Sequence, residues 1–405
     1  MIPFRKFLNE EALDKALSPD VRGAIIDRGG KIYQIGGVVR DDMLGKVSKD
    51  LDLLVVGIDL KELGKIIERF GKVNLVGKSF GVLKFTPEGT SEEIDISVPR
   101  IDSKSTGKGH KDFEVKLGKG ISLEQDQLRR DFWMNAIAKD VETGEVHDMG
   151  GRGKLDIENR VVRMINPQAF QDDPLRMLRA VQFAARFEFK IEPKTYNEIK
   201  KNAKLIKSVS AERFQEEFKK LFTKSSKPSY GLKLMIELGL MKLLFSQVKK
   251  ISPIVDRIPK ANFPAFMGVL LSDLGSQAGK AARKVMKVSN IDADSIDGVV
   301  RAIKDKNLGK DEVELVKWVQ ELSPESIDNI DSYLRTDKKK TISDRLNIMR
   351  RQGKPTSRKE LPIGGKDVMD LGIKGPRIGA ALDKALEYAI RKGNQGREDL
   401  LGILR

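Results

Sequence analysis

The chain of 405 residues contains no cysteine and only two histidines, His110 and His147. These absences exclude a disulfide framework, a zinc finger, a thiol nucleophile and a multi-histidine metal centre. The N-terminal segment lacks the basic-then-apolar pattern of a signal peptide, and no apolar run approaches the roughly 18 residues of a membrane span. The sequence therefore predicts a soluble cytoplasmic protein without a membrane segment, in which carboxylates hold any metal ion.

The positive charge of the chain is concentrated in its C-terminal part. The chain has 75 Lys and Arg residues against 59 Asp and Glu residues, a formal net charge of +16. Residues 1–150 hold 24 basic and 26 acidic side chains, whereas residues 151–405 hold 51 and 33. This excess of +18 favours a polyanionic partner. A lysine-rich, well-solvated helical surface is the alternative.

Hydrophobic periodicity changes along the chain and predicts an α+β fold. Near the N-terminus, short β-branched or apolar runs such as KIYQIGG and LDLLVVG are separated by Gly, Pro and Asp. From about residue 155 onward, apolar residues recur at helical spacing, as in DPLRMLRAVQFAARF. We expect a head with a mixed sheet and helices, followed by an all-helical remainder. The expected parts are residues 1–150, 151–245, 246–350 and 351–405.

The segment IGGVVRDDMLGKVSKDLDLLVV carries a pair of carboxylates, Asp50 and Asp52, at the start of a predicted strand. Residues i and i+2 of a strand project from one face, so the two carboxylates converge. Such a pair suits Mg²⁺, which prefers oxygen ligands and phosphates. Upstream, the backbone at Gly36 and Gly37 can approach a triphosphate, and Arg40 adds positive charge. A solvated strand end is the alternative for the carboxylate pair alone.

A Gly-Gly pair separated by twelve residues from Asp-x-Asp resembles the signature of the DNA polymerase beta nucleotidyltransferase superfamily. Asp95, in EEIDISVPR, is similar to the third acidic residue of that superfamily. A solvated strand face is the alternative reading of Asp95. The resemblance implies a polymerase-beta-like nucleotidyltransferase head.

The segment IGGVVRDDMLGKVSKDLDLLVV also resembles a narrower group. It is similar to the first motif of the class II tRNA nucleotidyltransferases, the CCA-adding enzymes, and of their relatives the bacterial poly(A) polymerases. Three later segments agree in order: RRDFWMNAIA, LDIENRVVRMI with Asp156, and DDPLRMLRAVQFAAR. The tail segment GKDVMDLGIKGPRIGAALDKALEYAIRKG is also similar to the C-terminal helical pair of this family. The resemblance extends from about residue 30 to the end of the chain, and it implies a head, neck, body and tail.

The resemblance assigns nucleotide-binding roles to five charged residues. Asp173, Arg176 and Arg179 lie at i, i+3 and i+6, which places them along one edge of a helix. A carboxylate and a guanidinium can together match the hydrogen-bonding edge of a base. By resemblance, Asp173 and Arg176 read the incoming base, and Arg130 and Asp131 meet the phosphate and ribose of the nucleotide. A surface salt bridge and a charged helix turn are the alternatives.

Several positions depart from the family pattern. Asp172 stands where Glu is usual, Gln182 replaces a commonly basic residue, and Trp133 and Met134 replace Thr and Ile. The segment HDMGGRGKLD has one residue more than usual before Asp156, which puts the coupling role of that motif in doubt. Gln182 puts one phosphate contact in doubt.

Two glycine-containing segments are further candidates for nucleotide or RNA contact. Residues 103–115, SKSTGKGHKDFEV, occupy the place of the flexible loop that takes part in switching from C to A addition in the family. In the tail, GIKGPRIG could meet a phosphate through backbone amides, or it could be a plain helix-capping turn.

The resemblance implies a Mg²⁺-dependent enzyme that adds C, C and A to the 3′ end of tRNA from CTP and ATP and releases pyrophosphate. Asp50 and Asp52 would hold the metal, and the basic helical part would hold the tRNA by its phosphates. One alternative is a bacterial-type poly(A) polymerase or a partial enzyme that adds only CC or only A. Another is a non-catalytic RNA-binding protein with an inactive head.

Overall fold

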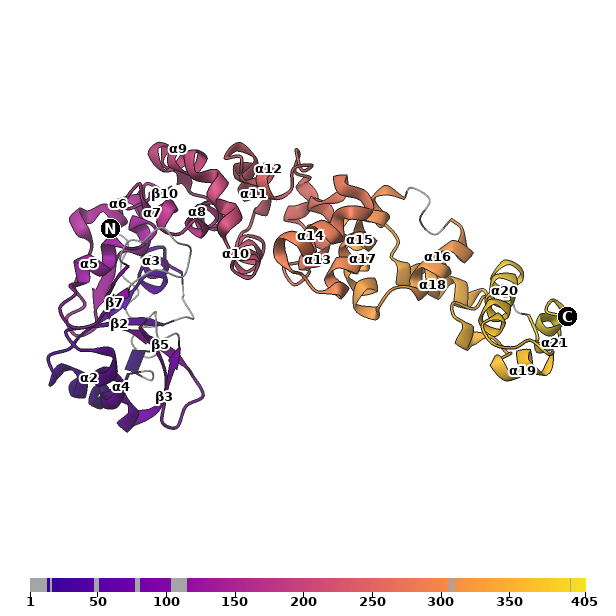
Figure 1. Cartoon of the computed structure of the whole chain (residues 1–405), viewed down its shortest axis with the longest axis horizontal. Coiled ribbons are helices and arrows are strands. Elements are labelled where there is room, and N and C mark those ends of the chain that lie inside the picture. The colour runs from indigo at the N-terminus through magenta and orange to yellow at the C-terminus, as the bar shows by residue number, and fades with distance from the viewer. Residues whose placement is uncertain are drawn as a thin grey trace. The chain divides into compact units, whose positions relative to one another are not determined.

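The computed structural model describes residues 13–14, 17–46, 51–76, 81–102, 115–305, 308, 310–393 and 395–405. Asp50 and residues 103–114 of the predicted loop lie outside this range. The chain divides into two compact units, Met1–Val209 and Ser210–Arg405. The first unit contains the sheet, and the second is helical (Figure 1). No helix of the described residues is long and apolar enough to cross a membrane.

A mixed seven-stranded sheet organises the first unit. Its strand order is β3-β4-β5-β2-β1-β8-β9, in which β2 and β5 are parallel and the other neighbouring pairs are antiparallel. β6 and β7 form an antiparallel pair, and β10 and β11 form a parallel pair. The strands are β1 (Lys31–Ile35), β2 (Asp52–Val56), β3 (Gly71–Val76), β4 (Val82–Pro87), β5 (Ile94–Ser97), β6 (Arg100–Asp102), β7 (Val115–Leu117), β8 (Ala138–Asp140), β9 (Val146–His147), β10 (Val161–Val162) and β11 (Lys190–Ile191).

Helices cover this sheet and continue the first unit beyond it. The α-helices are α2 (Pro19–Ile26), α3 (Gly37–Met43), α4 (Leu60–Ile67), α5 (Leu123–Leu128), α6 (Arg152–Glu158), α7 (Ala169–Asp172), α8 (Leu175–Phe187) and α9 (Pro193–Asn202). Short 3₁₀ turns are η1 (Glu68–Phe70), η2 (Trp133–Asn135), η3 (Met149–Gly151) and η4 (Ala203–Ser208).

The alternation of side chains along β2 determines which face of the sheet carries Asp52. Leu53 and Val55 belong to a core cluster that includes residues of α2 and α4, whereas Leu54 packs on the other face with Tyr33 and Leu123. Side chains two residues apart on a strand share a face. Asp52 therefore projects from the face of Leu54, away from the larger core cluster.

The second unit is built from helices around an aromatic core. Phe214, Phe218 and Phe222 recur every four residues along one helix and are buried, and Phe222 stacks on Phe266 with ring centroids 4.3 Å apart. The elements are α10 (Ala211–Lys224), α11 (Pro228–Glu237), α12 (Leu240–Leu244), η5 (Pro253–Asp256), α13 (Phe263–Leu270), η6 (Ser272–Gln277), α14 (Ala278–Met286), α15 (Asn290–Lys304), α16 (Glu312–Gln320), α17 (Pro324–Thr336), α18 (Ile342–Arg351), η7 (Arg358–Glu360), α19 (Gly365–Asp370), α20 (Arg377–Lys392) and α21 (Arg397–Gly402).

The predicted fold class is confirmed, with a mixed sheet in the N-terminal part and a helical remainder. The division between the two compact units falls after residue 209, inside the expected part 151–245. The finer division into four parts stays a prediction.

Candidate active site

The register of β2 and β5 brings two acidic residues side by side. Asp52 is paired with Asp95 across these parallel strands, so both carboxylates project from the same face of the sheet. Lys84 of β4 lies opposite Asp95, with 3.7 Å between its Nζ and Asp95 Oδ1, and its Nζ is 2.5 Å from Glu93 Oε1. Hydrogen bonding to Glu93 and the charge of Asp95 raise the pKa of Lys84. Carboxylate oxygens at this position suit a hard divalent cation.

Of the two predicted glycines, Gly36 forms the tight connection between β1 and α3, and Gly37 is the first residue of α3. Gly36 adopts φ 68° and ψ −120°, a conformation that favours glycine. A Cβ at Gly36 would lie 3.3 Å from Nη1 of Arg130, and a Cβ at Gly37 would lie 3.5 Å from Nη2 of Arg40. The structure therefore brings the Gly-Gly turn next to Arg130, a residue almost a hundred positions later in the sequence.

Arg40 is buried, with 3% of its surface exposed. Its Nε and Nη2 donate to Oδ1 of Asp41 at 2.9 and 2.7 Å, and its Nη1 donates to the side-chain oxygen of Asn135. The guanidinium also lies over the rings of Phe187 and Phe183, at 4.7 and 5.0 Å. Burial lowers the pKa of Arg40, and the charge of Asp41 opposes this shift. Arg40 thus faces protein groups in this arrangement, which suits a positioning role for α3 better than a direct phosphate contact.

Three arginines of α8 reach groups that come earlier in the chain. Arg186 Nη2 donates to Oδ2 of Asp41 at 2.9 Å, and Arg179 Nε donates to Oδ2 of Asp131 at 2.7 Å. Arg176 Nη2 donates to the backbone oxygen of Arg129 at 2.7 Å. These contacts fix α8, and with it the predicted base-reading residue Arg176, against the segment that contains Arg129 and Asp131.

Asp131 is a buried, ionised carboxylate at the centre of these contacts. It is 7% exposed, and its Oδ1 accepts hydrogen bonds from the backbone N of Phe132 at 2.8 Å and from Nδ2 of Asn135 at 3.0 Å. Burial acts to raise its pKa, but Arg179 and the hydrogen bond from Asn135 outweigh burial and lower it. Asp131, Asn135, Arg40 and Asp41 therefore form one continuous polar network between Arg179 and Arg186 of α8.

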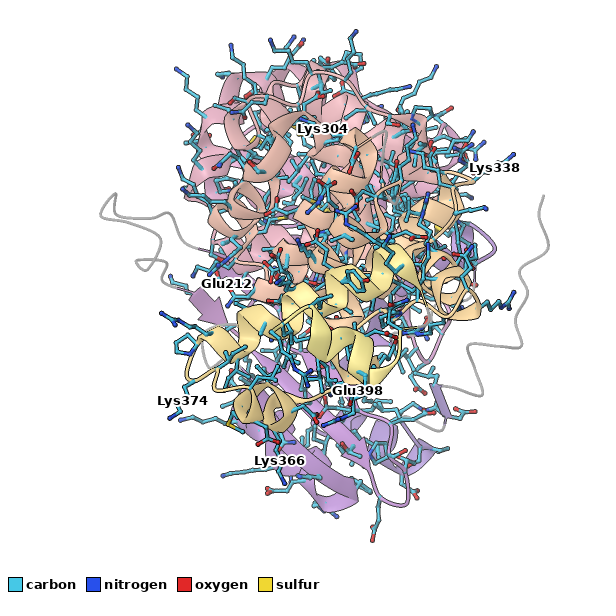
Figure 2. All side chains as sticks on the ribbon, turned by 90° about the vertical axis from the view of Figure 1, so that its right-hand side faces the viewer. Glu212, Lys304, Lys338, Lys366, Lys374 and Glu398 are labelled. Carbon is cyan, nitrogen blue, oxygen red and sulfur yellow. The ribbon has the colours of Figure 1, made fainter. Side chains whose placement is uncertain are left out.

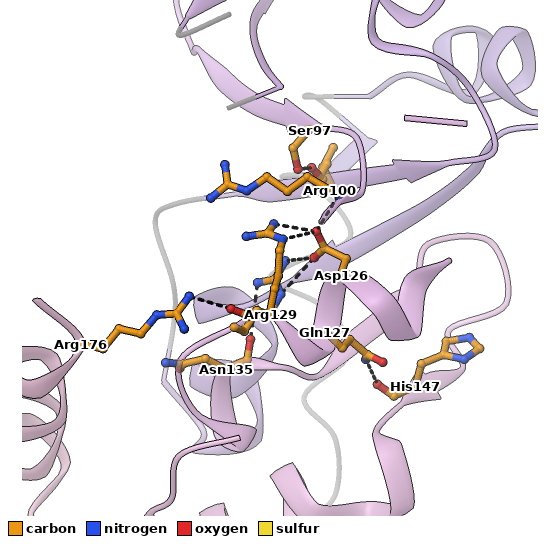
Figure 3. Close-up of polar contacts among 10 residues, drawn as sticks. Ser97, Arg100, Asp126, Gln127, Arg129, Asn135, His147 and Arg176 are labelled. Atoms are coloured by element: carbon orange, nitrogen blue, oxygen red, sulfur yellow. Dashed lines mark hydrogen bonds and ion pairs between the residues drawn. The ribbon is translucent and has the colours of Figure 1, made fainter. Parts of the chain in front are cut away.

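Asp126 of α5 was not among the residues expected from the sequence. It is fully buried, and it accepts two hydrogen bonds each from Arg129, at 2.8 and 2.6 Å, and Arg130, at 3.2 and 2.8 Å. Figure 3 shows this convergence, with Arg176 reaching Arg129 from the other side. The two arginines outweigh burial and lower the pKa of Asp126, whereas burial lowers the pKa of Arg129 to about 10. In the sequence, the i, i+4 spacing of Asp126 and Arg130 is the one feature that would have indicated this ion pair.

Asp173 was expected on one helix with Arg176 and Arg179, but its backbone is extended, with φ −140° and ψ 99°, and it lies between α7 and α8. Asp156 lies on α6. Oδ1 of Asp173 accepts a hydrogen bond from the backbone N of Leu175 at 3.1 Å, just before Arg176. Asp156 of α6 is 2% exposed and accepts from Nε of Arg163 at 2.9 Å. The structure therefore groups the Gly-Gly turn, Arg130, Asp131, Arg176 and Arg179, and it places Asp52 with Asp95. Asp50 lies outside the described residues.

A mixed sheet with a glycine turn after its first strand and two acids in register on neighbouring strands agrees with the nucleotidyltransferase head expected from the sequence. The family model "Poly A polymerase head domain" matches residues 32–163, and the model "Probable RNA and SrmB- binding site of polymerase A" matches residues 188–252. Residues 32–163 therefore belong to the poly(A) polymerase head family, and residues 188–252 are similar to the RNA-binding region of these polymerases. Nucleotidyltransferases of this family are generally metal-dependent.

Curated relatives and solved structures agree with this assignment. The Multifunctional CCA protein of Xanthomonas campestris pv. campestris is 36% identical over 223 residues, which cover 54% of this chain and 51% of the relative. The protein of that name from Haemophilus influenzae is 38% identical over 226 residues, covering 54% and 50%. The chain thus matches about half the length of these curated relatives.

The likeness to solved structures extends over almost the whole chain. The Bacillus stearothermophilus CCA-adding enzyme in complex with CTP has a TM-score of 0.75 and 24% identity, covering 97% of this chain and 96% of that one. The Thermotoga maritima CCA-adding enzyme complexed with tRNA has a TM-score of 0.64 and 21% identity, covering 97% of each chain. At these identities the likeness concerns the fold.

Proposed function

We propose that this protein adds C, C and A to the 3′ end of tRNA from CTP and ATP and releases pyrophosphate. The observation that carries the proposal is the pairing of Asp52 with Asp95 on one face of a nucleotidyltransferase sheet. Relatives named Multifunctional CCA protein, and solved CCA-adding enzymes in complex with CTP, ATP or tRNA, support the choice of reaction.

Asp50 and Asp52 would hold Mg²⁺. A bound Mg²⁺ would lower the pKa of the terminal ribose hydroxyl and stabilise charge on the departing pyrophosphate. The hydroxyl would lose its proton to water, and its oxygen would form a new bond to the α-phosphorus as the bond between that phosphorus and the bridging oxygen breaks and pyrophosphate leaves. Gly37 would offer its backbone N–H to the triphosphate, and Gly36, whose own N–H donates to the backbone oxygen of Ile137 at 3.4 Å, would allow the close approach. Arg130, beside Gly36, would add a guanidinium.

Base selection is proposed for Asp173 and Arg176 at the start of α8. The hydrogen bond from Arg176 to the backbone oxygen of Arg129 fixes one nitrogen of its guanidinium. The bond between Arg179 and Asp131 fixes the next turn of the helix against the same segment. A guanidinium with a fixed orientation presents its other donors in a defined direction, which is what a protein template for C and A requires.

The helical remainder of the chain is proposed to hold tRNA. Residues 210–405 contain 38 basic and 26 acidic side chains, an excess of +12. Figure 2 labels exposed lysines from this unit, among them Lys338, Lys366 and Lys374. We assign residues 1–150 to a catalytic head, 151–245 to a neck, 246–350 to a body and 351–405 to a tail, and we place the protein in the cytoplasm.

Replacement of one carboxylate tests the proposed chemistry. Asp52→Ala is expected to abolish nucleotide incorporation into tRNA while leaving tRNA affinity nearly unchanged, because the substitution removes a metal ligand and no phosphate contact. Asp27→Ala, at an exposed position after α2, is the matched control and is expected to retain full activity. Retained incorporation by Asp52→Ala would contradict the two-carboxylate mechanism.

A further inference from the structure

A chain of hydrogen bonds starts and ends on α8. It runs from Arg179 through Asp131, Asn135, Arg40 and Asp41 to Arg186. The arginines and the amide nitrogen of Asn135 donate, and the carboxylates and the amide oxygen of Asn135 accept. Asp41 and Asn135 are each only 5% exposed, so the middle of this chain is shielded from water. A buried polar network whose members are paired favours one arrangement of the elements that it joins.

Asp41 is the member of this network that joins two helices directly. Its Oδ1 accepts from Nε and Nη2 of Arg40, at 2.9 and 2.7 Å, and its Oδ2 accepts from Nη2 of Arg186 at 2.9 Å. Asp41 lies on α3, one turn after Gly37, which is proposed to meet the triphosphate. Arg186 lies on α8, which also carries the proposed base-reading residue Arg176. Asp41 therefore links the helix at the triphosphate to the helix at the base.

The position of Arg186 near the end of α8 gives this link leverage over the base. Hydrogen bonds hold the helix at Arg176, Arg179 and Arg186. At about 1.5 Å per residue, Arg186 lies about 10 Å along the axis from Arg179, and Arg176 lies about 4.5 Å away on the other side. A tilt about Arg179 that shifts Arg186 by about 2 Å would therefore move Arg176 by about 0.9 Å. Groups that recognise a substrate need to be held within about 0.5 Å of their working position.

We propose that Asp41 is a specificity-determining positioning residue, which acts through Arg186 on the orientation of α8 and so on the choice between C and U. This role rests on the proposed transfer of nucleotides to tRNA. Cytosine carries an amino group where uracil carries an oxygen, so the two bases need donors and acceptors in different places. While Asp41 holds Arg186, the donors of Arg176 keep one direction, and uracil leaves polar groups unpaired. Without this bond, α8 adjusts to either base.

The ratio of kcat/KM for CTP to kcat/KM for UTP measures this role. It is determined with the full-length protein, Mg²⁺ and tRNA lacking CCA, with one nucleotide supplied at a time. A loss of stability alone reduces the amount of active enzyme, which lowers both values of kcat/KM equally and leaves their ratio unchanged. A displaced α8 lowers kcat/KM for CTP more than kcat/KM for UTP, because the transition state with the correct base loses more contacts.

Two substitutions break the link from its two sides. Asp41→Asn keeps the size of the side chain but offers one acceptor oxygen where Arg40 and Arg186 need two. Arg186→Met removes the donor and keeps an apolar side chain against the ring of Phe187, whose centre lies 4.8 Å from Cζ of Arg186. Each is expected to lower the ratio about tenfold, less than the roughly hundredfold effect of a 1 Å misplacement. Arg186 is partly exposed, so Arg186→Met provides the test even where Asp41→Asn fails to fold.

The double variant and two matched controls separate positioning from stability. Because Asp41 acts through Arg186, the double variant is expected to lower the ratio no further than Arg186→Met alone. Arg22→Met removes a cation whose side chain is 19% exposed and whose Nη2 lies 3.1 Å from Oδ1 of Asp14. Glu192→Gln alters a carboxylate that is 13% exposed and accepts from the backbone N of Thr195 at 2.7 Å. Both controls lie in the first unit and are expected to lower the Tm without changing the ratio.

The possible outcomes distinguish this inference from the proposed function. A protein that discriminates between CTP and UTP, but whose ratio Arg186→Met leaves unchanged, would overturn the role of Asp41 and Arg186 alone. An equal fall of the ratio in Arg22→Met or Glu192→Gln would overturn it as well. Losses that multiply in the double variant would contradict the action of Asp41 through Arg186. If the unsubstituted protein incorporates neither nucleotide, the proposed function fails and this role fails with it.

Discussion

Asp126 should be the most sensitive single position in the head, because one buried carboxylate holds two arginines. Asp126→Ala removes five hydrogen bonds, two from Arg129, two from Arg130 and one from the backbone N of Arg100. The side chains of these arginines are only 19% and 16% exposed, so water replaces the lost partner poorly. Breaking a buried ion pair in this way costs about 3 to 5 kcal/mol, and we take the lower value of about 3 kcal/mol because the arginines are partly rather than fully buried. For a unit of this size, that corresponds to a fall in Tm of roughly 6 to 12 °C.

The activity of Asp126→Ala should fall as well, because Arg130 lies beside the Gly-Gly turn. Thermal unfolding followed by circular dichroism measures the stability, and incorporation of labelled CTP into tRNA measures the activity. Glu124→Gln, an exposed position on the same helix, is the control and should change stability by less than about 0.5 kcal/mol. If Asp126→Ala matched Glu124→Gln in both assays, the assigned role of the buried ion pair would be refuted.

Three further predictions follow from the same contacts. Arg40→Lys should lower the unfolding free energy by about 2 to 4 kcal/mol, because lysine cannot bind Asp41 and Asn135 together. Arg186→Lys, which affects one hydrogen bond and one contact with the ring of Phe187, should cost about 1 kcal/mol in the same denaturant titration, and equal losses would contradict this account. Because the pKa of Asp131 is lowered in the folded protein, Asp131 is protonated at a higher pH in the unfolded state than in the folded state. The stabilisation from Asp131 is therefore complete above the pKa of its unfolded form, near 3.8, and it is lost as the pH falls through the lower pKa of the folded form. Asp131→Asn should make the unfolding free energy less dependent on pH in urea titrations below about pH 5. The affinity for tRNA should fall steeply with salt, since lysine–phosphate contacts release counterions, and a flat profile in filter binding would count against the basic helical unit as the RNA-binding part.

Short-range patterns in the sequence were sufficient to predict much of the fold. The β-branched run after Asp52 forms β2, and the helical spacing around Arg176 and Arg179 forms α8. The glycine turn also lies where the sequence predicts it, between a strand and a helix. These elements depend on periodicity and turn chemistry within about fifteen residues, which a single sequence records.

Features that depend on contacts between residues far apart in the sequence could not be predicted from short-range patterns. The pairing of Asp52 with Asp95 depends on the order and register of strands, which hydrophobic alternation alone does not determine. Burial of Arg40 against Phe187 turns an expected phosphate ligand into a candidate for a positioning role.

The central claim is that the head extends tRNA by a defined sequence without a template. The most direct test incubates the full-length protein with Mg²⁺ and tRNA lacking CCA, supplying CTP alone, ATP alone, or both, and sequences the 3′ ends. The account predicts addition of CC with CTP alone and of CCA with both nucleotides, after which extension stops. Long A-tails on arbitrary RNA would instead indicate a poly(A) polymerase, and no consumption of either nucleotide would contradict catalysis by this chain.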